Sequence, residues 1–310
     1  MLIVLEGVDK AGKSTLAQEL QKLLKWPVIH FGKPGPNPAD EYGVFLKQNK
    51  GNYILDRFYV GELIYAPLLR NKHSLTATQK TTIERLCRSR GTVLIHVAPD
   101  YKIIEKRLNQ LGDDMINNEQ NKKAYNMFHE VMPFVNIQIK CKWDGTGSVN
   151  NIAKEIVNDL LKRQEDYELA QNYCTGIGTT MGKKIVLIGE KLNKKVSWLG
   201  FPFDNGSASE FLQQCLPFHY EKYVYAVNSD TIKEEEVRFL ISTGPTSFIS
   251  LGKKAEEKCD KLGINHKSIP HPQYWKRFKF ARRSDYTEML YKAMKEANVY
   301  NENINGLQYI

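Results

Sequence analysis

Apolar runs closed by glycine, aspartate or proline alternate with amphipathic stretches through the first 165 residues of the chain. The runs predict strands at Leu2–Gly7, Asn52–Asp56 and Thr92–Pro99. The amphipathic stretches predict helices at Lys13–Leu24, Tyr101–Leu111 and Ile152–Leu161. Because the strands are apolar on both faces and helices separate them, the pattern predicts a parallel sheet covered by helices on both sides.

A second alternation of the same kind begins after residue 182. Thr175–Gly182 is small, glycine-rich and uncharged, which is typical of a linker. Beyond it, strands are predicted at Lys184–Gly189, Tyr223–Asn228 and Ser247–Gly252, with helices at Ser207–Cys215, Lys233–Ile241 and Lys253–Leu262. The sequence therefore predicts an α/β protein with domains at 1–165 and 183–310, joined by a linker at 166–182.

Composition fits this picture and narrows it. A chain of 310 residues with 42% hydrophobic and 25% charged residues is typical of a globular protein. No apolar run approaches the roughly 18 residues that a membrane span needs, and the start MLIVLEGVD has no basic lead, so we expect neither a membrane segment nor a signal peptide. Five scattered cysteines indicate reduced thiols, and we expect a cytoplasmic protein. The net charge of +9 suits nucleotides and nucleic acids equally.

The turn after the first strand carries the most specific motif. Residues 7–14, GVDKAGKS, satisfy G-x-x-x-x-G-K-[ST] between an apolar strand and an amphipathic helix. Backbone N–H groups of such a loop wrap phosphates, and the positive end of the helix dipole faces the anion. The residues predicted to hold ATP are Gly7, Gly12, Lys13, Ser14 and Thr15. Lys13 would reach the β- and γ-phosphates, and the Ser14 hydroxyl would bind Mg²⁺.

Asp56 and Arg57 close the second apolar strand. A carboxylate at the carboxyl end of a parallel strand, beside a phosphate loop, can hold Mg²⁺, so we expect Asp56 to join Ser14 as a metal ligand. The adjacent arginine can bridge donor and acceptor phosphates during transfer. The alternative is a surface ion pair after a strand.

The segments EGVDKAGKST, DRFYVGELIY, HVAPDYKIIEKRL and MFHEV together resemble the thymidylate kinase branch of the nucleoside monophosphate kinases. The resemblance covers about the first 165 residues and implies a three-layer P-loop kinase domain that uses ATP and Mg²⁺ and is commonly dimeric. It implies that Asp9 contacts the acceptor sugar, that Lys10 supplies a cation near the transferring phosphate, and that Arg57 bridges the phosphates.

The same resemblance places the acceptor near three further residues, Lys33, Tyr59 and Tyr65. For the two tyrosines, ordinary helix packing is an equal alternative. The expected lid, residues 109–124, has no arginine, which agrees with the class that keeps its extra cation in the loop. Only Asp40–Asn52 is available where the family has a long helix that grips the acceptor nucleotide, so we expect a shortened or opened acceptor site.

Five segments of the second half, LIGEKLN, WLGFPFDNGSASEFL, YAVNSD, SFISLGKKA and IPHPQYW, occur in an order that resembles the uracil-DNA glycosylase superfamily. The resemblance implies an α/β domain with a base pocket in which Phe203 stacks, Asn228 reads the base edge and His271 stabilises the departing base. Glu190 would be the polar residue left for water activation. Lys191 stands where some relatives carry a catalytic Asp, so we expect weak or absent glycosylase activity and a base- or DNA-binding module. The alternative is that these side chains are only structural.

A basic stretch follows that pocket motif. Residues 267–283 hold six basic side chains and no acid, with four aromatic side chains interleaved. Cations for phosphates and aromatic faces for bases are what nucleic-acid contact requires, so the stretch predicts DNA as a partner. The alternative is a solvated basic face.

Three functions remain open at this point. The leading one is an ATP- and Mg²⁺-dependent kinase that converts dTMP or a 5-substituted dUMP into the diphosphate. The second keeps the kinase but phosphorylates a hydroxymethylated pyrimidine already in DNA, as in viral or phage DNA hypermodification. The third is a DNA repair or base-recognition protein whose P-loop only senses nucleotide.

Overall fold

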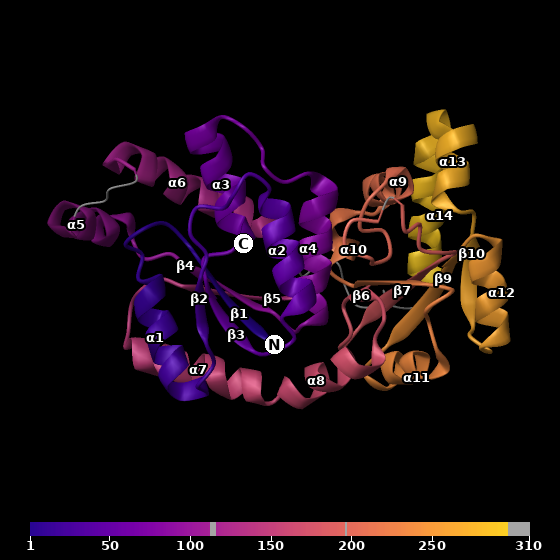
Figure 1. Ribbon diagram of the computed structural model, residues 1–310, viewed down its shortest axis with the longest axis horizontal. Coiled ribbons are helices and arrows are strands. Elements are labelled where there is room, and N and C mark those ends of the chain that lie inside the picture. Colours follow the sequence, from indigo (N-terminus) through magenta and orange to yellow (C-terminus); the bar gives the residue numbers. More distant parts are fainter. Residues whose placement is uncertain (112–115, 196, 297–310) are drawn as a thin grey trace. The chain divides into compact units, whose positions relative to one another are not determined.

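The computed structural model describes residues 1–111, 116–195 and 197–296 (Figure 1). The chain forms two compact units: unit 1 comprises Met1–Thr76 and Arg90–Glu168, and unit 2 comprises Ala77–Ser89 and the chain from Leu169 on. Part of the expected lid, residues 112–115, and the last part of the expected second domain, residues 297–310, lie outside the described residues.

Unit 1 is built on a five-stranded parallel sheet in the order β2-β3-β1-β4-β5. Its strands are β1 (Leu2–Glu6), β2 (Val28–His30), β3 (Tyr53–Asp56), β4 (Val93–Val97) and β5 (Ile139–Trp143). Every residue of β1 is buried, as expected for the central strand of a sheet covered on both faces. The predicted parallel sheet is confirmed in this unit.

The helices of unit 1 connect these strands and cover both faces of the sheet. They are α1 (Lys13–Leu24), α2 (Pro38–Gln48), α3 (Tyr59–Arg70), α5 (Tyr101–Leu111), α6 (Asn118–Val131) and α7 (Val149–Leu161). Helices α1 and α7 pack together on one side, and α2 and α3 lie on the other (Figure 1). The chain leaves β1 toward β3 on one side and reaches β4 on the other, so the strand order reverses at β1, which is where ligands bind in open α/β sheets.

The hydrophobic pattern of the sequence does not predict β2 and β5, the two edge strands of this sheet. Strand β2 has three residues, all at least partly exposed, and β5 carries exposed positions between Ile139 and the buried Trp143. An edge strand needs no continuous apolar run, because one side of it is not covered by a neighbouring strand. The hydrophobic pattern therefore found the central strands and missed the edges.

Unit 2 has its own five-stranded sheet, in the order β10-β9-β7-β8-β6. Its strands are β6 (Ile177–Gly178), β7 (Lys184–Gly189), β8 (Val224–Asn228), β9 (Thr246–Leu251) and β10 (His266–Ile269), of which only β6 runs antiparallel to its neighbour. Along β7, Ile185 and Leu187 belong to one buried cluster, whereas Val186 and Ile188 belong to another. Both faces of this sheet are therefore covered.

Six helices of unit 2 follow β7 in the described part of the chain. They are α9 (Ser207–Cys215), α10 (Phe218–Glu221), α11 (Glu234–Ser242), α12 (Lys253–Lys261), α13 (Pro272–Phe278) and α14 (Arg283–Glu296), with α8 (Gln164–Tyr173) leading in from unit 1. Short 3-10 turns at Met132–Phe134 in unit 1 and Phe280–Arg282 in unit 2 complete the fold.

Helix α4 (Ala77–Ser89) belongs to unit 2 although it lies within the predicted first domain. Its Arg85 and Arg88 are fully buried, and both contact the carboxylate of Glu221 on α10. Arg85 Nε donates to Glu221 Oε1 at 2.6 Å and Arg88 Nη2 at 3.3 Å. The periodicity of α4 predicts nothing about which sheet it covers, because that choice depends on a residue 133 positions away from Arg88 along the chain.

The glycine-rich stretch predicted as part of a linker, Thr175–Gly182, instead includes strand β6. Gly178 adopts a φ of +130°, and a Cβ there would lie 2.1 Å from the carbonyl oxygen of Val224. Just before the strand, Thr175 donates from its N–H and its hydroxyl to Glu236 of α11. Glycine is needed here because two backbones approach each other closely. A glycine-rich edge strand of this kind has the same composition as a flexible linker, so composition alone does not distinguish them.

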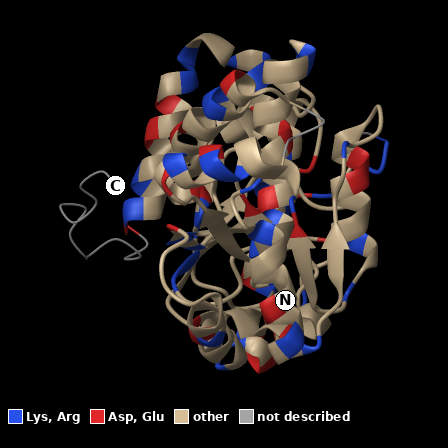
Figure 2. Ribbon diagram, turned by 90° about the vertical axis from the view of Figure 1, so that its left-hand side faces the viewer, with Lys and Arg blue, Asp and Glu red and all other residues tan. Residues whose placement is uncertain are grey.

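None of the described helices combines the length and the apolar character that crossing a bilayer would take. In the view of Figure 2, basic and acidic segments are interspersed along the helices, in keeping with 44 basic and 35 acidic residues in the chain.

Truncating Glu221 to alanine is expected to lower the free energy of unfolding by about 3–5 kcal/mol, because it leaves two buried guanidinium groups without their counter-ion. The matched control is Glu234→Ala, which removes an ion pair with Arg238 whose side chains are 60% and 78% exposed. That change is expected to cost about 0–1 kcal/mol. Urea denaturation of both variants measures the difference, and equal losses would contradict the assignment of α4 to unit 2.

Candidate functional site

The loop between β1 and α1 has the backbone of a phosphate-binding turn. Gly7 has a φ of +150°, and a Cβ there would lie 2.3 Å from the carbonyl oxygen of Val97 at the end of β4. Lys10 and Gly12 also have positive φ values, 62° and 110°. Helix α1 begins at Lys13, so its unpaired N–H groups face the loop. Of the five residues predicted to hold ATP, Gly7 and Gly12 therefore lie on this turn, and Lys13, Ser14 and Thr15 form the start of α1.

Lys13 is buried within the loop. Its Nζ donates to the carbonyl oxygens of Gly7 at 2.8 Å and Val8 at 2.7 Å, and lies 3.9 Å from Asp9 Oδ1. Burial lowers the pKa of Lys13, and the nearby carboxylate of Asp9 opposes that shift. Main-chain carbonyl oxygens of the loop thus fix the position of the Lys13 ammonium group.

Ser14 and Asp56 meet beside this loop. Ser14 Oγ donates to Asp56 Oδ2 at 2.8 Å, and His30 Nδ1 lies 3.1 Å from the same oxygen. Asp56 is 3% exposed, and its Oδ1 has no hydrogen-bond partner. A hydroxyl and a buried carboxylate with a spare oxygen fit a Mg²⁺ ion that takes its other ligands from phosphate and water. Among the described residues there is no cluster of three or more His, Cys, Asp or Glu side chains that could hold a metal without such help.

Arg57 and Asp9 form an ion pair across the site. Arg57 has a φ of 67°, a conformation that costs a non-glycine residue energy, and its N–H donates to the carbonyl of Leu5 at 3.0 Å. Its guanidinium donates to Asp9 Oδ1. The strained turn after β3 thus places the Arg57 side chain beside Asp9 of the loop.

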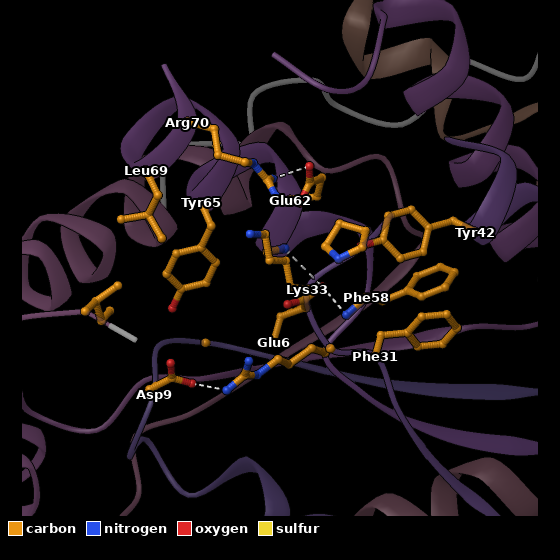
Figure 3. Close-up of a pocket in the computed structure, with 16 residues that line it drawn as sticks. Glu6, Asp9, Phe31, Lys33, Tyr42, Phe58, Glu62, Tyr65, Leu69 and Arg70 are labelled. Carbon is orange, nitrogen blue, oxygen red and sulfur yellow. Dashed lines mark hydrogen bonds and ion pairs between the residues drawn. The ribbon is translucent and has the colours of Figure 1, made fainter. Parts of the chain in front are cut away.

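A cavity of about 270 Å³ adjoins the loop and these charges (Figure 3). Phe31, Tyr42 and Phe58 form an aromatic wall, with ring centroids of Phe31 and Phe58 5.1 Å apart and those of Tyr42 and Phe58 4.9 Å apart. Aromatic side chains of this kind supply an apolar body for a flat ligand. Phe31 follows β2, Tyr42 belongs to α2, and Phe58 immediately precedes α3. The sequence predicts the α2 segment only as a shortened part of the acceptor site.

Two predicted acceptor residues, Lys33 and Tyr65, line the cavity, and Lys33 is exposed. Tyr59 is fully buried, packs edge-on against Phe58 with centroids 5.7 Å apart, and is not part of the lining. Glu62 and Arg70 form an ion pair in the lining that the sequence analysis did not single out. Their spacing of eight on one helix gives no motif by which to find them.

Glu6, the last residue of β1, is a second carboxylate that the sequence analysis overlooked. It is fully buried, lines the cavity, and its Oε1 accepts from the N–H groups of Phe58, Val60 and Gly61 at 3.0, 3.1 and 3.3 Å. Burial raises the pKa of Glu6 to about 7, against the effect of these N–H groups and of Lys13. An acidic residue inside an otherwise apolar buried strand was the available signal.

Arg107 of α5 supports the loop from outside. Its Nη1 donates to the carbonyl oxygens of Lys10 at 2.9 Å and Ala11 at 3.1 Å. A guanidinium bound to the loop carbonyls adds positive charge beside a phosphate site. The helix carries several basic residues, and only its packing singles out this one.

Unit 2 has a separate pocket, of about 170 Å³, at the carboxyl ends of its parallel strands. It brings together all four residues predicted there, Glu190, Phe203, Asn228 and His271. A Cβ at Gly189 would lie 2.8 Å from the Phe203 ring and 2.9 Å from Asn228 Oδ1, so glycine allows these two side chains to close over the strand end.

The surroundings of this pocket are polar and ordered. Burial lowers the pKa of His271, and Glu190 opposes the shift. His271 Nδ1 accepts from the N–H of Gln273 at 3.2 Å, which leaves Nε2 to carry the proton of the neutral ring. Asp204 holds the adjoining loop by accepting from Ser197 Oγ and from the N–H groups of Leu199 and Phe201.

No protein-family model matches the chain. In sequence it is 33% identical over 162 residues to the SPbeta prophage-derived uncharacterized protein YorR of Bacillus subtilis strain 168, a match that covers 50% of the chain and 96% of that protein. The crystal structure of Bacillus subtilis YorR in complex with phosphorylated GDP is 27% identical, with a TM-score of 0.47, covering 53% of this chain and 98% of that one. The deoxyadenosine kinase of M. mycoides with bound dATP is 20% identical, with a TM-score of 0.33, covering 52% and 99%.

Adding a methyl group at Gly7 is expected to destabilise the protein by about 1–3 kcal/mol, because the Cβ must displace the end of β4. Gly35→Ala is the matched control, since a Cβ at Gly35 meets no atom within 4 Å. Thermal unfolding should show a lower midpoint for Gly7→Ala and an unchanged one for Gly35→Ala. A Gly7→Ala variant as stable as the parent would show that the close approach to Val97 is not a constraint.

Proposed function

The chain belongs to the YorR family over the 162 residues that the two proteins share, and from this premise we propose that unit 1 transfers the γ-phosphoryl group of ATP to a nucleoside-type acceptor. The observation that carries the proposal is the position of Lys13, held at a phosphate-binding turn beside a cavity with an aromatic wall. A phosphate loop alone binds nucleotides, whereas an adjoining cavity of about 270 Å³ provides room for a second substrate.

The loop and the start of α1 support the proposal that ATP is the phosphoryl donor. The N–H groups from Gly7 to Thr15 and the positive end of the helix dipole suit the phosphates of ATP. Lys13 would exchange its contacts to the loop carbonyls for phosphate oxygens, and Lys10 would add a second positive charge beside them. The low exposure of the Lys13 site strengthens these interactions, because less water screens them.

Ser14 and Asp56 are the residues proposed to hold Mg²⁺, on the strength of the spare carboxylate oxygen at Asp56. When bound, the ion neutralises charge on the phosphate oxygens and orients them. His30 shares the Asp56 carboxylate and would keep it in place for this role.

Arg57 is proposed to act on charge that develops during transfer. Arg57 lines the cavity beside the loop, and Asp9 accepts a hydrogen bond from its guanidinium and so orients it. A guanidinium in this position stabilises the phosphoryl group in the transition state of transfer more than it stabilises either substrate. Asp9, because it is bound to Arg57, orients rather than removes a proton.

The acceptor is the finer part of this proposal. The thymidylate kinase resemblance favours dTMP or a 5-substituted dUMP, and the hydroxymethylated pyrimidine of DNA is the second candidate. The aromatic wall, Lys33 and Tyr65 would contact either one. Guanine nucleotides belong in any acceptor panel, since YorR was crystallised with phosphorylated GDP.

For unit 2 we propose a nucleobase- or DNA-binding role, in line with the glycosylase resemblance. Its support is the pocket that gathers Phe203, Asn228 and His271, next to which α13 exposes Tyr274 and Phe278, 51% and 71% exposed and with ring centroids 5.2 Å apart. These rings stand among the basic residues of 267–283. In the third candidate function, base recognition by this unit is the main activity and the P-loop only senses nucleotide.

Replacing Lys13 with alanine is expected to reduce ATP-dependent phosphoryl transfer by a factor of about 1,000 or more, because no other side chain takes its place at the phosphates. Lys22→Ala, which removes an exposed lysine of the same helix, is the matched control and should leave transfer unchanged. ADP formation with a mixture of acceptors, together with calorimetric binding of ATP, measures both variants. Binding of ATP without any ADP formation would favour the sensing function instead.

Truncating Tyr274 and Phe278 together to alanine is expected to weaken binding of single-stranded DNA by about 1–3 kcal/mol for each stacked base. Phe218→Ala, at an aromatic residue 49% exposed outside the basic stretch, is the control. Fluorescence anisotropy with a labelled oligonucleotide at several salt concentrations gives the affinities. A double variant that binds like the parent, or binding that does not fall with salt, would contradict a DNA-binding role.

A further inference from the structure

The cavity beside the phosphate loop contains a buried carboxylate with an unused oxygen. Glu6 Oε1 is fully occupied by the N–H groups at the start of α3, whereas Glu6 Oε2, on the same buried side chain, has no hydrogen-bond partner. Figure 3 shows Glu6 between Asp9 and Glu62 in the cavity lining. A buried acceptor left without a donor costs about 1–3 kcal/mol, so this oxygen is suited to a group that the ligand brings.

Most of the other charges of the cavity are paired with one another. Three acidic and three basic side chains line it. Two of the basic ones are bound to two of the acidic ones, Arg57 to Asp9 and Arg70 to Glu62. Among the charged lining residues that the structure describes, the two outside these ion pairs are Lys33, which is exposed, and Glu6, which is buried.

This balance discriminates between the two classes of acceptor. A phosphate monoester brings about two negative charges, which the ionised Glu6 would repel. Both arginines already face carboxylates, so among the described lining residues the exposed Lys33 is the cation left to offset those charges. A primary hydroxyl is neutral and brings a hydrogen-bond donor, which is what Glu6 Oε2 lacks. The apolar and aromatic remainder of the lining suits an uncharged nucleoside.

We propose that the acceptor is a primary hydroxyl of a nucleoside rather than a phosphate, and that Glu6 Oε2 is the catalytic residue that takes its proton. The inference rests on the phosphoryl transfer proposed above. The hydroxyl oxygen forms a bond to the γ-phosphorus of ATP as the bond from that phosphorus to the β–γ bridging oxygen breaks. The electron pair of the broken bond leaves with ADP, and the hydroxyl proton moves to Glu6.

Two sources could supply the hydroxyl, the sugar 5′ position of a free nucleoside and a hydroxymethyl group on a pyrimidine base. Both present the same neutral alcohol to Glu6. The burial that brings the pKa of Glu6 to about 7 suits a group that must accept a proton and release it near neutral pH.

The test supplies the full chain with Mg²⁺ and γ-labelled ATP and offers four classes of acceptor in parallel. These are the deoxynucleosides including thymidine, 5-hydroxymethyldeoxyuridine, DNA containing hydroxymethyluracil, and the deoxynucleoside monophosphates with dGMP and dTMP among them. Label in any hydroxyl class at a kcat/KM at least tenfold above that for every monophosphate supports the inference. Label in thymidine identifies the sugar 5′ hydroxyl, and label in DNA containing hydroxymethyluracil identifies the base hydroxymethyl group.

Label mainly in a monophosphate, giving the diphosphate, would overturn the inference while leaving the proposed kinase function intact. Absence of label in every arm, together with absence of ATP binding by calorimetry, would overturn both. The two failures are therefore distinguishable.

Glu6→Gln separates a catalytic role from a structural one, because glutamine keeps the oxygen that accepts from the start of α3 and loses only the basic one. We expect kcat with the hydroxyl acceptor to fall by a factor of about 100–10,000, with the KM for ATP within twofold of the parent. Glu105→Gln, at an exposed position of α5, is the matched control and should behave like the parent. A Glu6→Gln variant that folds, as measured by circular dichroism, and retains its kcat would overturn the role of Glu6.

Discussion

Parallel pairing of β1 with β3 and β4 brings the carboxyl ends of three strands to one edge of the sheet, and the chemistry of unit 1 depends on that constraint. The phosphate-binding turn follows β1, and Asp56 with Arg57 follows β3. The end of β4 supplies the carbonyl of Val97, against which Gly7 packs too closely for any side chain. Loop conformation and site geometry are thus set by the sheet and not by the loop sequence alone.

Burying charge at this edge is costly, and the structure offsets it with local partners. Lys13 is held by main-chain carbonyls, Asp56 by Ser14 and His30, and Glu6 by the first N–H groups of α3. Each arrangement replaces water with fixed dipoles. Such preorganised dipoles stabilise the charge that develops when a phosphoryl group is transferred. The oxygens left over, Asp56 Oδ1 and Glu6 Oε2, mark the places where a cation and a proton donor would complete the site.

Unit 2 applies the same topological rule to different residues. Its strand order reverses at β7, and the pocket residues follow the ends of β7, β8 and β10. Gly189 lets Phe203 and Asn228 approach the strand end, in the way that Gly7 lets the phosphate loop pass β4. The two halves share no repeat, so the common position of both pockets reflects where parallel sheets leave room for ligands.

The sequence by itself determined the elements whose causes are local. Continuous apolar runs located the central strands, glycine and lysine spacing located the phosphate loop, and the ordered motifs of the second half named four residues that do line one pocket. These features follow from the pattern of neighbouring residues, which a linear chain displays directly.

Tertiary structure alone decided the features that depend on distant partners. Helix α4 joins unit 2 through Glu221, a residue more than 130 positions away, and the glycine-rich stretch before β7 forms an edge strand because Val224 lies against it. In the sequence, Glu6 stands at the end of an apolar run, and Glu62 and Arg70 have no spacing that distinguishes them from other polar helix residues. Their pairing, burial and unused oxygens arise only once the chain is folded, because solvation and charge partners are properties of the packed site.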